Sequence, residues 1–137
     1  MNQADKYDWK NQKPLVKHYD EADFKTGGFR PYNLYRDLGV IAATNGMVKA
    51  HIVRAERGKE KGESGDRHAH HVDFQFVYML KGWQTMEMEG VGIFTVHAGG
   101  CWTQPPGIKH EVLDYSEDRE VLEITLPSTY ETTSVER

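Results

Sequence analysis

The segment from His68 to Leu80, His-Ala-His-His-Val-Asp-Phe-Gln-Phe-Val-Tyr-Met-Leu, decides the fold. Its second half is rich in aromatic and β-branched residues, which favour β-strands. Residues two apart in a strand point to the same face, so His68 and His70 would direct two imidazoles at one point. Gln75 follows a short turn and can return to the same interior with a neutral amide oxygen. The segment therefore predicts β-structure around a metal site that needs a further ligand from elsewhere.

The strand expected from Phe74 to Leu80 has two unlike faces. Counting alternate residues from Gln75 places Val77 and Met79 on the inner face. The outer face then carries four large apolar residues: Phe74, Phe76, Tyr78 and Leu80. Such a row needs cover from another sheet, from an arm or from a second subunit. We therefore expect a homodimer.

The rest of the chain indicates short strands separated by turns. We expect an edge strand at residues 14–19, a helical turn at 20–25 capped by Asp20, and a hairpin turn at Asn45-Gly46. Further expected elements are strands at 47–54, 110–115 and 120–126, a mobile loop at 56–67, a hairpin of 83–89 with 91–96 about Gly90, and a surface strand or frayed end from Ser128 onward. Because no long amphipathic helix is present, the pattern predicts an all-β sandwich or jelly roll.

Composition excludes several classes of protein. The 137 residues carry a formal charge of −4, whereas a protein that binds nucleic acid needs a basic face. No run of about 18 apolar residues is present, so no membrane-spanning helix is expected. The one cysteine, Cys101, cannot form an internal disulfide, which fits a reducing compartment and predicts a cytoplasmic protein. We expect a small-molecule substrate, and neither nucleic acid nor membrane as a partner.

A further imidazole is offered by His110, which begins a strand after a proline-glycine turn, and the spacing around the histidines resembles the two motifs of the cupin superfamily. The first motif reads Gly62, five residues, His68-Ala69-His70, four residues, Gln75, six residues and Gly82. The second reads Gly99, five residues, Pro105-Pro106-Gly107, two residues, His110, three residues and Asp114. All spacings hold. The two departures are Gln75, where the family has Glu, and Asp114, where the family has Asn.

The resemblance implies a cupin double-stranded β-helix, which is a jelly-roll barrel, with an N-terminal arm. We expect residues 1–35 to form the arm and an edge strand, 36–127 the cupin barrel, and 128–137 a C-terminal tail. The resemblance also implies one divalent metal ion near the mouth of the barrel. Its ligands would be His68, His70, Gln75 and His110, and mixed nitrogen and oxygen ligation suits Fe, Mn, Ni, Co or Zn without selecting among them.

Gln75 in place of Glu changes the charge of the expected site. A site of three histidines and a glutamate offsets one positive charge of a divalent cation, whereas three histidines and a glutamine offset none. We therefore expect lower metal affinity, a metal that is a stronger Lewis acid, and a less favoured trivalent state.

The expected function is metal-dependent chemistry on a small molecule. The leading hypothesis is Lewis-acid catalysis of the isomerase or lyase type on a polar carbonyl compound or a molecule like a sugar acid. The alternatives are a non-haem Fe(II) dioxygenase and a non-catalytic small-molecule binding or sensor module. No catalytic residue is assigned, although an inward carboxylate at Glu87 or Glu89 could act as a general base. Six residues are candidates for the substrate pocket: His51, Arg54, Tyr78, Trp83, Trp102 and Gln104.

Overall fold

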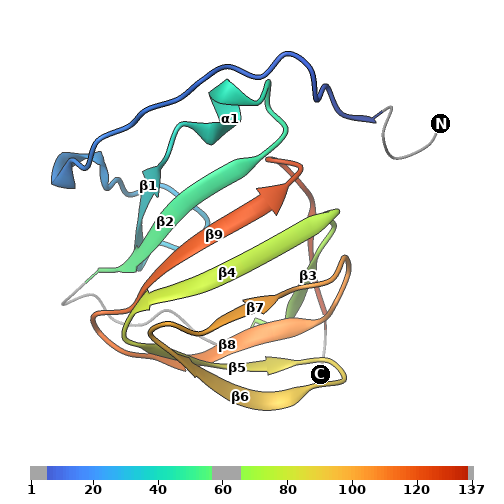
Figure 1. Ribbon diagram of the computed structural model, residues 1–137. Helices are drawn as coiled ribbons and strands as arrows, with labels where there is room; N and C mark the ends of the chain where they lie inside the picture. The colour runs from blue at the N-terminus through green and yellow to red at the C-terminus, as the bar shows by residue number, and fades with distance from the viewer. Residues whose placement is uncertain (1–5, 57–65, 136–137) are drawn as a thin grey trace.

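The computed structural model describes residues 6–56 and 66–135, whose strands form two antiparallel five-stranded sheets (Figure 1). The first sheet has the order β1 (Asn33–Asp37), β2 (Lys49–Ala55), β9 (Glu120–Leu126), β4 (Phe74–Lys81) and β7 (Cys101–Thr103). The second has the order β10 (Thr132–Ser134), β3 (His68–His70), β8 (His110–Tyr115), β5 (Trp83–Met88) and β6 (Gly92–His97). Helical structure includes the 3₁₀ turn η2 (Glu21–Asp23) and the short helix α1 (Val40–Ala43). No helix among these described residues is long and apolar enough to cross a membrane.

The inner faces of the two sheets enclose the core, as strand alternation predicts. On β4, the buried residues Gln75, Val77 and Met79 alternate with neighbours that face outward. Val77 and Met79 pack with Val53 of β2 and Val121 of β9. The all-β jelly-roll architecture expected from the sequence is therefore confirmed.

The outer face of β4 carries the apolar row that the sequence predicts. Phe74, Tyr78 and Leu80 are exposed, and Phe76 is half-buried. Burying these side chains against a second copy would remove apolar surface from water. The homodimer stays a prediction.

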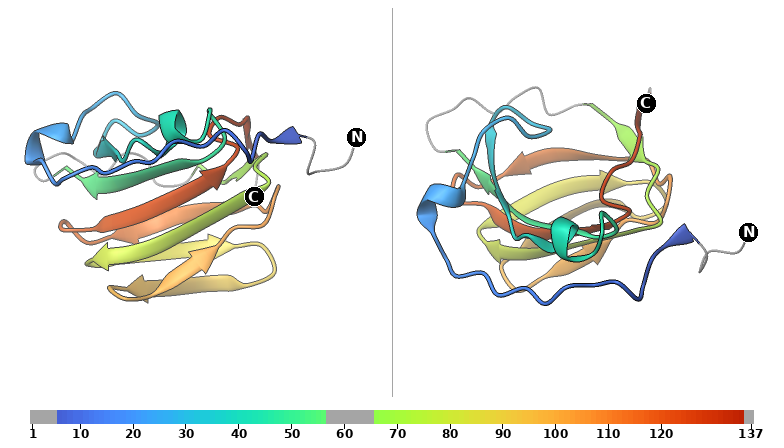
Figure 2. Two further views of the ribbon diagram at one scale, coloured as in Figure 1. Left: turned by 45° about the horizontal axis from the view of Figure 1, so that its top comes forward. Right: turned by 90° about the horizontal axis from the view of Figure 1, so that it is seen from above.

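The N-terminal arm differs from the sequence-based expectation. Residues 14–19 are exposed and form no strand, so the expected edge strand is wrong. Pro14 cannot donate to a ladder, and the carbonyl of His18 accepts from Arg36 Nη2 at 3.2 Å rather than from a strand. The backbone N–H of Lys13 donates to the carbonyl of Ala43 at 2.8 Å, which ties the arm to the end of α1 (Figure 2).

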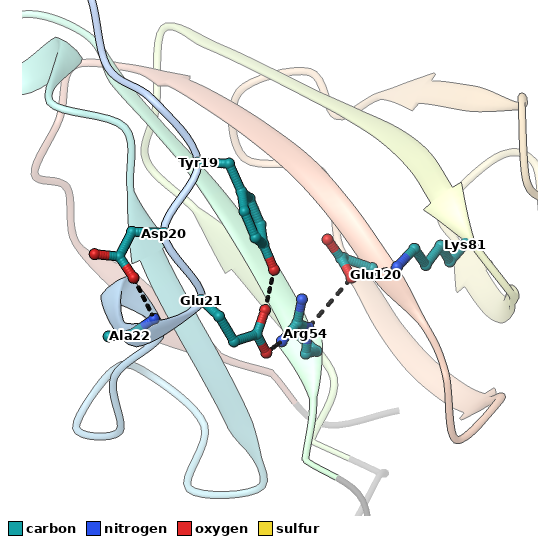
Figure 3. Close-up of polar contacts among 7 residues, drawn as sticks. All are labelled: Tyr19, Asp20, Glu21, Ala22, Arg54, Lys81 and Glu120. Atoms are coloured by element: carbon teal, nitrogen blue, oxygen red, sulfur yellow. Dashed lines mark hydrogen bonds and ion pairs between the residues drawn. The ribbon is translucent and has the colours of Figure 1, made fainter.

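The Asn45-Gly46 pair ends a helix and does not connect two strands. Both residues have positive φ, at 53° and 83°, and Gly46 N–H donates to the carbonyl of Ile41 at 2.8 Å. Two left-handed residues terminate a helix as readily as they close a hairpin, so the sequence pattern alone did not separate the two outcomes. The expected capping of η2 is confirmed, because Asp20 Oδ1 accepts from Ala22 N at 3.0 Å (Figure 3).

Two strands lie at or beyond the expected limits between arm, barrel and tail, and the division into these three segments stays a prediction. β1 spans the expected limit at residues 35 and 36, and it pairs with β2. In the tail, β10 pairs with β3, so this part is a strand of the second sheet. The loop expected at 56–67, which includes Gly62, lies mostly outside the described residues.

Arg54, a candidate for the substrate pocket, instead joins the arm to the outside of the barrel. It faces away from the core because its neighbour Val53 points inward. Its guanidinium donates to Glu21 of η2 and, from Nε at 3.2 Å, to Glu120 of β9 (Figure 3). It also lies 3.7 Å from the centre of the Phe24 ring, a cation–π contact.

Replacing Arg54 by alanine should therefore loosen the arm. We expect faster tryptic cleavage between residues 13 and 25 and a loss of about 1 kcal/mol in the free energy of unfolding, the size of a cation–π contact with partly exposed ion pairs. Limited proteolysis and urea unfolding measure the two effects. The control is Arg67→Ala, which removes an ion pair with Glu87 in the other sheet. Equal cleavage of the two variants would contradict the role of Arg54.

Candidate metal centre and its cavity

Three histidines meet where β3 and β8 pair. His68 and His70 are two residues apart on β3, and His68 lies directly opposite His110, the first residue of β8. One ring nitrogen from each of the three lies within 4.8 Å of the others. The alternation on one strand and the register with the next therefore bring three imidazoles to one point, as the motif spacing predicts.

Each of the three imidazoles has a partner for its Nδ1. His68 Nδ1 lies 2.7 Å from the carbonyl oxygen of Asp66, and His110 Nδ1 lies 3.0 Å from that of Ile108. His70 Nδ1 lies 2.8 Å from the hydroxyl of Thr132 on β10. A hydrogen on Nδ1 leaves the lone pair on Nε2, so the tautomer held by these contacts is the one that binds a metal through Nε2.

Burial keeps these histidines neutral. It is the largest cause lowering the pKa of His70 to about 3 and that of His110 to about 4, and it also lowers the pKa of His68. Repulsion from neighbouring imidazoles lowers the pKa of His70 and that of His110 further. Neutral imidazoles are the form that coordinates a divalent cation, so the donor set fits a metal ion.

Gln75 lies on the inner face of β4 and lines the same cavity. Its Nε2 donates to Glu123 Oε2 at 3.0 Å. Its Oε1 accepts from Gln104 Nε2 at 3.3 Å, and that same Nε2 lies 3.0 Å from His110 Nε2. Gln104 Oε1 in turn accepts from Trp102 Nε1 at 2.9 Å. The amide oxygen of Gln75 is thus held toward the His110 side, and its role as a fourth ligand stays a prediction.

Glu123 is a carboxylate lining the cavity that the sequence reasoning missed. It lies on β9 opposite His51 of β2, and its Oε1 is 2.7 Å from His51 Nε2. Burial opposes its ionisation, but the hydrogen bond and charge of His51, helped by Lys49 and Gln75, lower its pKa to about 2. A negative charge therefore lies one hydrogen bond behind Gln75, and this modifies the expectation of a site without any anionic compensation.

A cavity of about 500 Å³ opens beside the histidine cluster, between the two sheets. Of the six pocket candidates, His51, Trp102 and Gln104 line it. Tyr78 faces outward from β4 and is 37% exposed. Trp83 lies on the outer face of β5 because Gln84 points inward, and Arg54 binds the arm. These three are placed away from the cavity by strand alternation.

Two further groups give the cavity features that the sequence did not predict. Tyr130, in the tail, has its ring 5.2 Å from that of His70, and Lys49 Nζ lies 5.0 Å from the Tyr130 ring centre. Both residues line the cavity. The carboxylates considered as general bases lie elsewhere: Glu87 pairs with Arg67, and Glu89 pairs with Lys109. The alternating Leu122-Glu123-Ile124 pattern was the one available clue to an inward carboxylate.

No protein-family model and no curated protein matches the sequence. Solved structures do match. The polyketide cyclase RemF from Streptomyces resistomycificus superposes with a TM-score of 0.66 at 15% identity, over 90% of this chain and 87% of that one. A sugar phosphate isomerase of the cupin superfamily from Silicibacter pomeroyi gives 0.60 at 18% identity, over 80% and 75%. The oxalate decarboxylase of Lactobacillus farciminis gives 0.60 at 18% identity, over 83% of this chain and 34% of that one, so the chain spans about a third of its length.

These similarities and the paired sheets define a double-stranded β-helix barrel with a histidine cluster suited to a metal ion. The chain has the cupin fold.

His110→Ala should remove metal binding at micromolar metal. Changes to groups that only orient a ligand cost about 10–100-fold in metal affinity, so loss of a ligand should weaken binding by at least about 100-fold. Equilibrium dialysis with elemental analysis gives the stoichiometry. His71→Ala is the matched control, because His71 Nε2 lies 2.7 Å from Thr133 and His71 is not in the cluster. Full stoichiometry in His110→Ala would contradict the assignment.

Exchanging Gln75 and Glu123 tests the fourth ligand. Gln75→Glu alone would set two carboxylates in contact, which favours protonation of one of them. The double variant Gln75→Glu/Glu123→Gln keeps a hydrogen-bond donor and an acceptor between positions 75 and 123. It moves the negative charge from position 123 to position 75, toward the histidines. If Gln75 is a ligand, this double variant should bind Zn²⁺ tighter than the wild type in competition with a chelator. Affinity equal to or below that of the wild type would place Gln75 outside the coordination sphere.

Proposed function

We propose that the protein is a divalent-metal-dependent enzyme of the isomerase or lyase type, which moves a proton within a small polar molecule. The observation that carries this proposal is the Glu123–His51 pair, a half-buried carboxylate and imidazole in the same cavity as the three-histidine cluster. A metal-binding cluster beside an ionised carboxylate is the arrangement that Lewis-acid proton transfer requires.

His68, His70 and His110 would hold the ion, with Gln75 as a further candidate. A bound divalent cation would polarise a carbonyl or hydroxyl oxygen of the substrate and make the adjacent proton more acidic. The cavity beside the cluster is large enough for a small molecule, because its volume of about 500 Å³ lies within the usual range for ligand sites.

Glu123 would accept the proton. Its carboxylate is ionised and is oriented from both sides, by His51 on Oε1 and by Gln75 on Oε2. His51 Nε2, at 2.7 Å, can share the accepted proton and return it to another atom of the substrate. A carboxylate of low pKa is a weak base, so this transfer suits a proton that coordination has already made acidic.

The comparisons support this class of reaction. Two of the similar structures are named for a cyclisation and for a sugar phosphate isomerisation. The alternative with a specific observation in its favour is a non-haem Fe(II) dioxygenase, since three neutral imidazoles also suit Fe(II) and leave open coordination positions. A non-catalytic binding or sensor module is the remaining alternative.

We further propose that the protein is cytoplasmic and forms a homodimer. A cytoplasmic location fits Cys101, the one cysteine of the sequence, which is a free thiol on the surface. A homodimer fits the exposed apolar row on β4.

Glu123→Gln should abolish proton exchange, while its three histidines should still bind the metal when the metal is supplied at saturating concentration. The metal-loaded protein is incubated in D₂O with a panel of 2-keto acids and uronic acids, and loss of C–H signals is followed by NMR. General-base removal should slow exchange by at least about 100-fold. Glu87→Gln, on the outside of β5, is the control. Unchanged exchange in Glu123→Gln would refute its role, and consumption that requires both iron and O₂ would favour the dioxygenase.

A further inference from the structure

Arg119 carries a buried positive charge that lines the cavity. The residue is 4% exposed and follows the turn between β8 and β9. Its Nη1 donates to Gln84 Oε1 at 3.0 Å, and its Nη2 donates to Asn33 Oδ1. The guanidinium carbon lies 4.2 Å from the centre of the Tyr115 ring. All these partners are neutral.

Among the carboxylates that the structure describes, none pairs with this guanidinium. The ion pairs found within residues 6–56 and 66–135 do not include Arg119. Its Nε has no hydrogen-bond partner among those residues. Burying a cation without a counter-charge is costly, and buried charges in proteins are normally paired. The cation–π contact with Tyr115 compensates only part of this cost.

The cavity as a whole is cationic, although the protein is acidic. Among the described residues, its charged lining consists of Arg30, Lys49 and Arg119 against Glu123, three cations and one anion. The chain carries −4 in total. Arg30 has a distant partner, Asp66 at 3.9 Å, at the surface. A bound divalent cation would add to this excess, so the cavity favours an anionic ligand.

The distance between the histidines and Arg119 sets the length of such a ligand. In the pairing of β5 with β8, Met88 lies opposite His110, whereas Gln84, which holds Arg119, lies opposite Tyr115. Met88 is four positions along the strand from Gln84, roughly 13 Å at the usual rise per residue of a strand. The lining between the two levels is apolar and includes Met86, Val112 and Val121. The cavity therefore has a metal end, an apolar middle and a cationic end.

We infer that Arg119 is the receptor for a carboxylate on the ligand. The ligand class is a small carboxylic acid with an apolar middle and, on the order of 10 Å from its carboxylate, an oxygen that reaches the metal centre. A guanidinium has five N–H donors in a planar fork, and Arg119 has unused donors at Nε and at both Nη atoms, which suits a carboxylate. The oxygen end of this description rests on the proposed function, whereas the carboxylate end rests on Arg119 alone.

The test compares 4-phenylbutyrate with 4-phenylbutan-1-ol, which share an apolar body and differ in the anionic group. Isothermal titration calorimetry of metal-free wild-type protein should show the carboxylate bound at least tenfold tighter than the alcohol. Gln84→Glu keeps the side-chain length and supplies the missing anion to Nη1. This variant should raise Tm and lower the affinity for 4-phenylbutyrate at least tenfold. Asn33→Asp, which supplies an anion to Nη2, should act in the same direction.

Thr85→Glu is the matched control, because it adds the same charge one residue along β5 on the outer face, where Thr85 contacts Thr95. It should leave the preference for the carboxylate unchanged and should not raise Tm, because residue 85 lies opposite Asp114 of β8. The inference is overturned if Gln84→Glu and Asn33→Asp both lower Tm, if their carboxylate affinity equals that of the wild type, or if the wild type binds neither probe.

The metal stoichiometry of the same proteins separates the two proposals. If the wild type binds no metal yet prefers the carboxylate, the proposed function fails and the inference about Arg119 stands. If it binds metal without preferring the carboxylate, the inference fails and the proposed function stands.

Discussion

The pairing of β3 with β8 is the constraint on which the site depends. One register pair, His68 opposite His110, joins the two motifs of the sequence in space. β3 has only three residues and is held on its other edge by β10, whose Thr132 also contacts His70. A shift of one residue in either register would turn the imidazoles to the opposite face, so backbone pairing defines the geometry of the cluster.

A chain of buried and half-buried side chains extends this order across the cavity. Hydrogen bonds of 2.7 to 3.3 Å link its members one after another in space, in the order His51, Glu123, Gln75, Gln104 and Trp102. Each side chain in this chain is hydrogen-bonded to the next, which is how polar groups in a protein interior are stabilised. Because β2, β9, β4 and β7 each contribute to it, the chain also fixes how the inner face of the first sheet meets the histidines.

The histidine cluster could be predicted because two strand rules suffice for it. Motif spacing gave His68, His70 and His110, and alternation placed Gln75 inward with Tyr78 outward, which already argued against Tyr78 as a pocket residue. Glu123 could not be predicted, because its meaning depends on pairing with β2 and β4, and neighbours far apart in sequence decide that pairing. The same limit explains why the sequence did not predict where the side chains of Arg54 and Arg119 lie. Both lie near the end of a strand in a β-rich region, yet one binds the arm outside and the other is buried within the cavity.

The arm and the tail show a second limit. Pro14 and the Asn45-Gly46 pair fit more than one local structure, and contacts with α1 and Arg36 select among them. Tyr130 and Thr132 lie in a polar segment that has no motif, and they reach the cavity only because β10 pairs with β3.

The contrast between a cationic cavity and an acidic surface also governs the rate at which an anion arrives. Charges interact over about 8 Å at physiological salt, so the cavity attracts an anion mainly near its entrance. At low salt, the net charge of −4 repels anions from farther away. Added salt screens this long-range repulsion first. Association of small anions should therefore accelerate as ionic strength rises, the reverse of ordinary electrostatic steering.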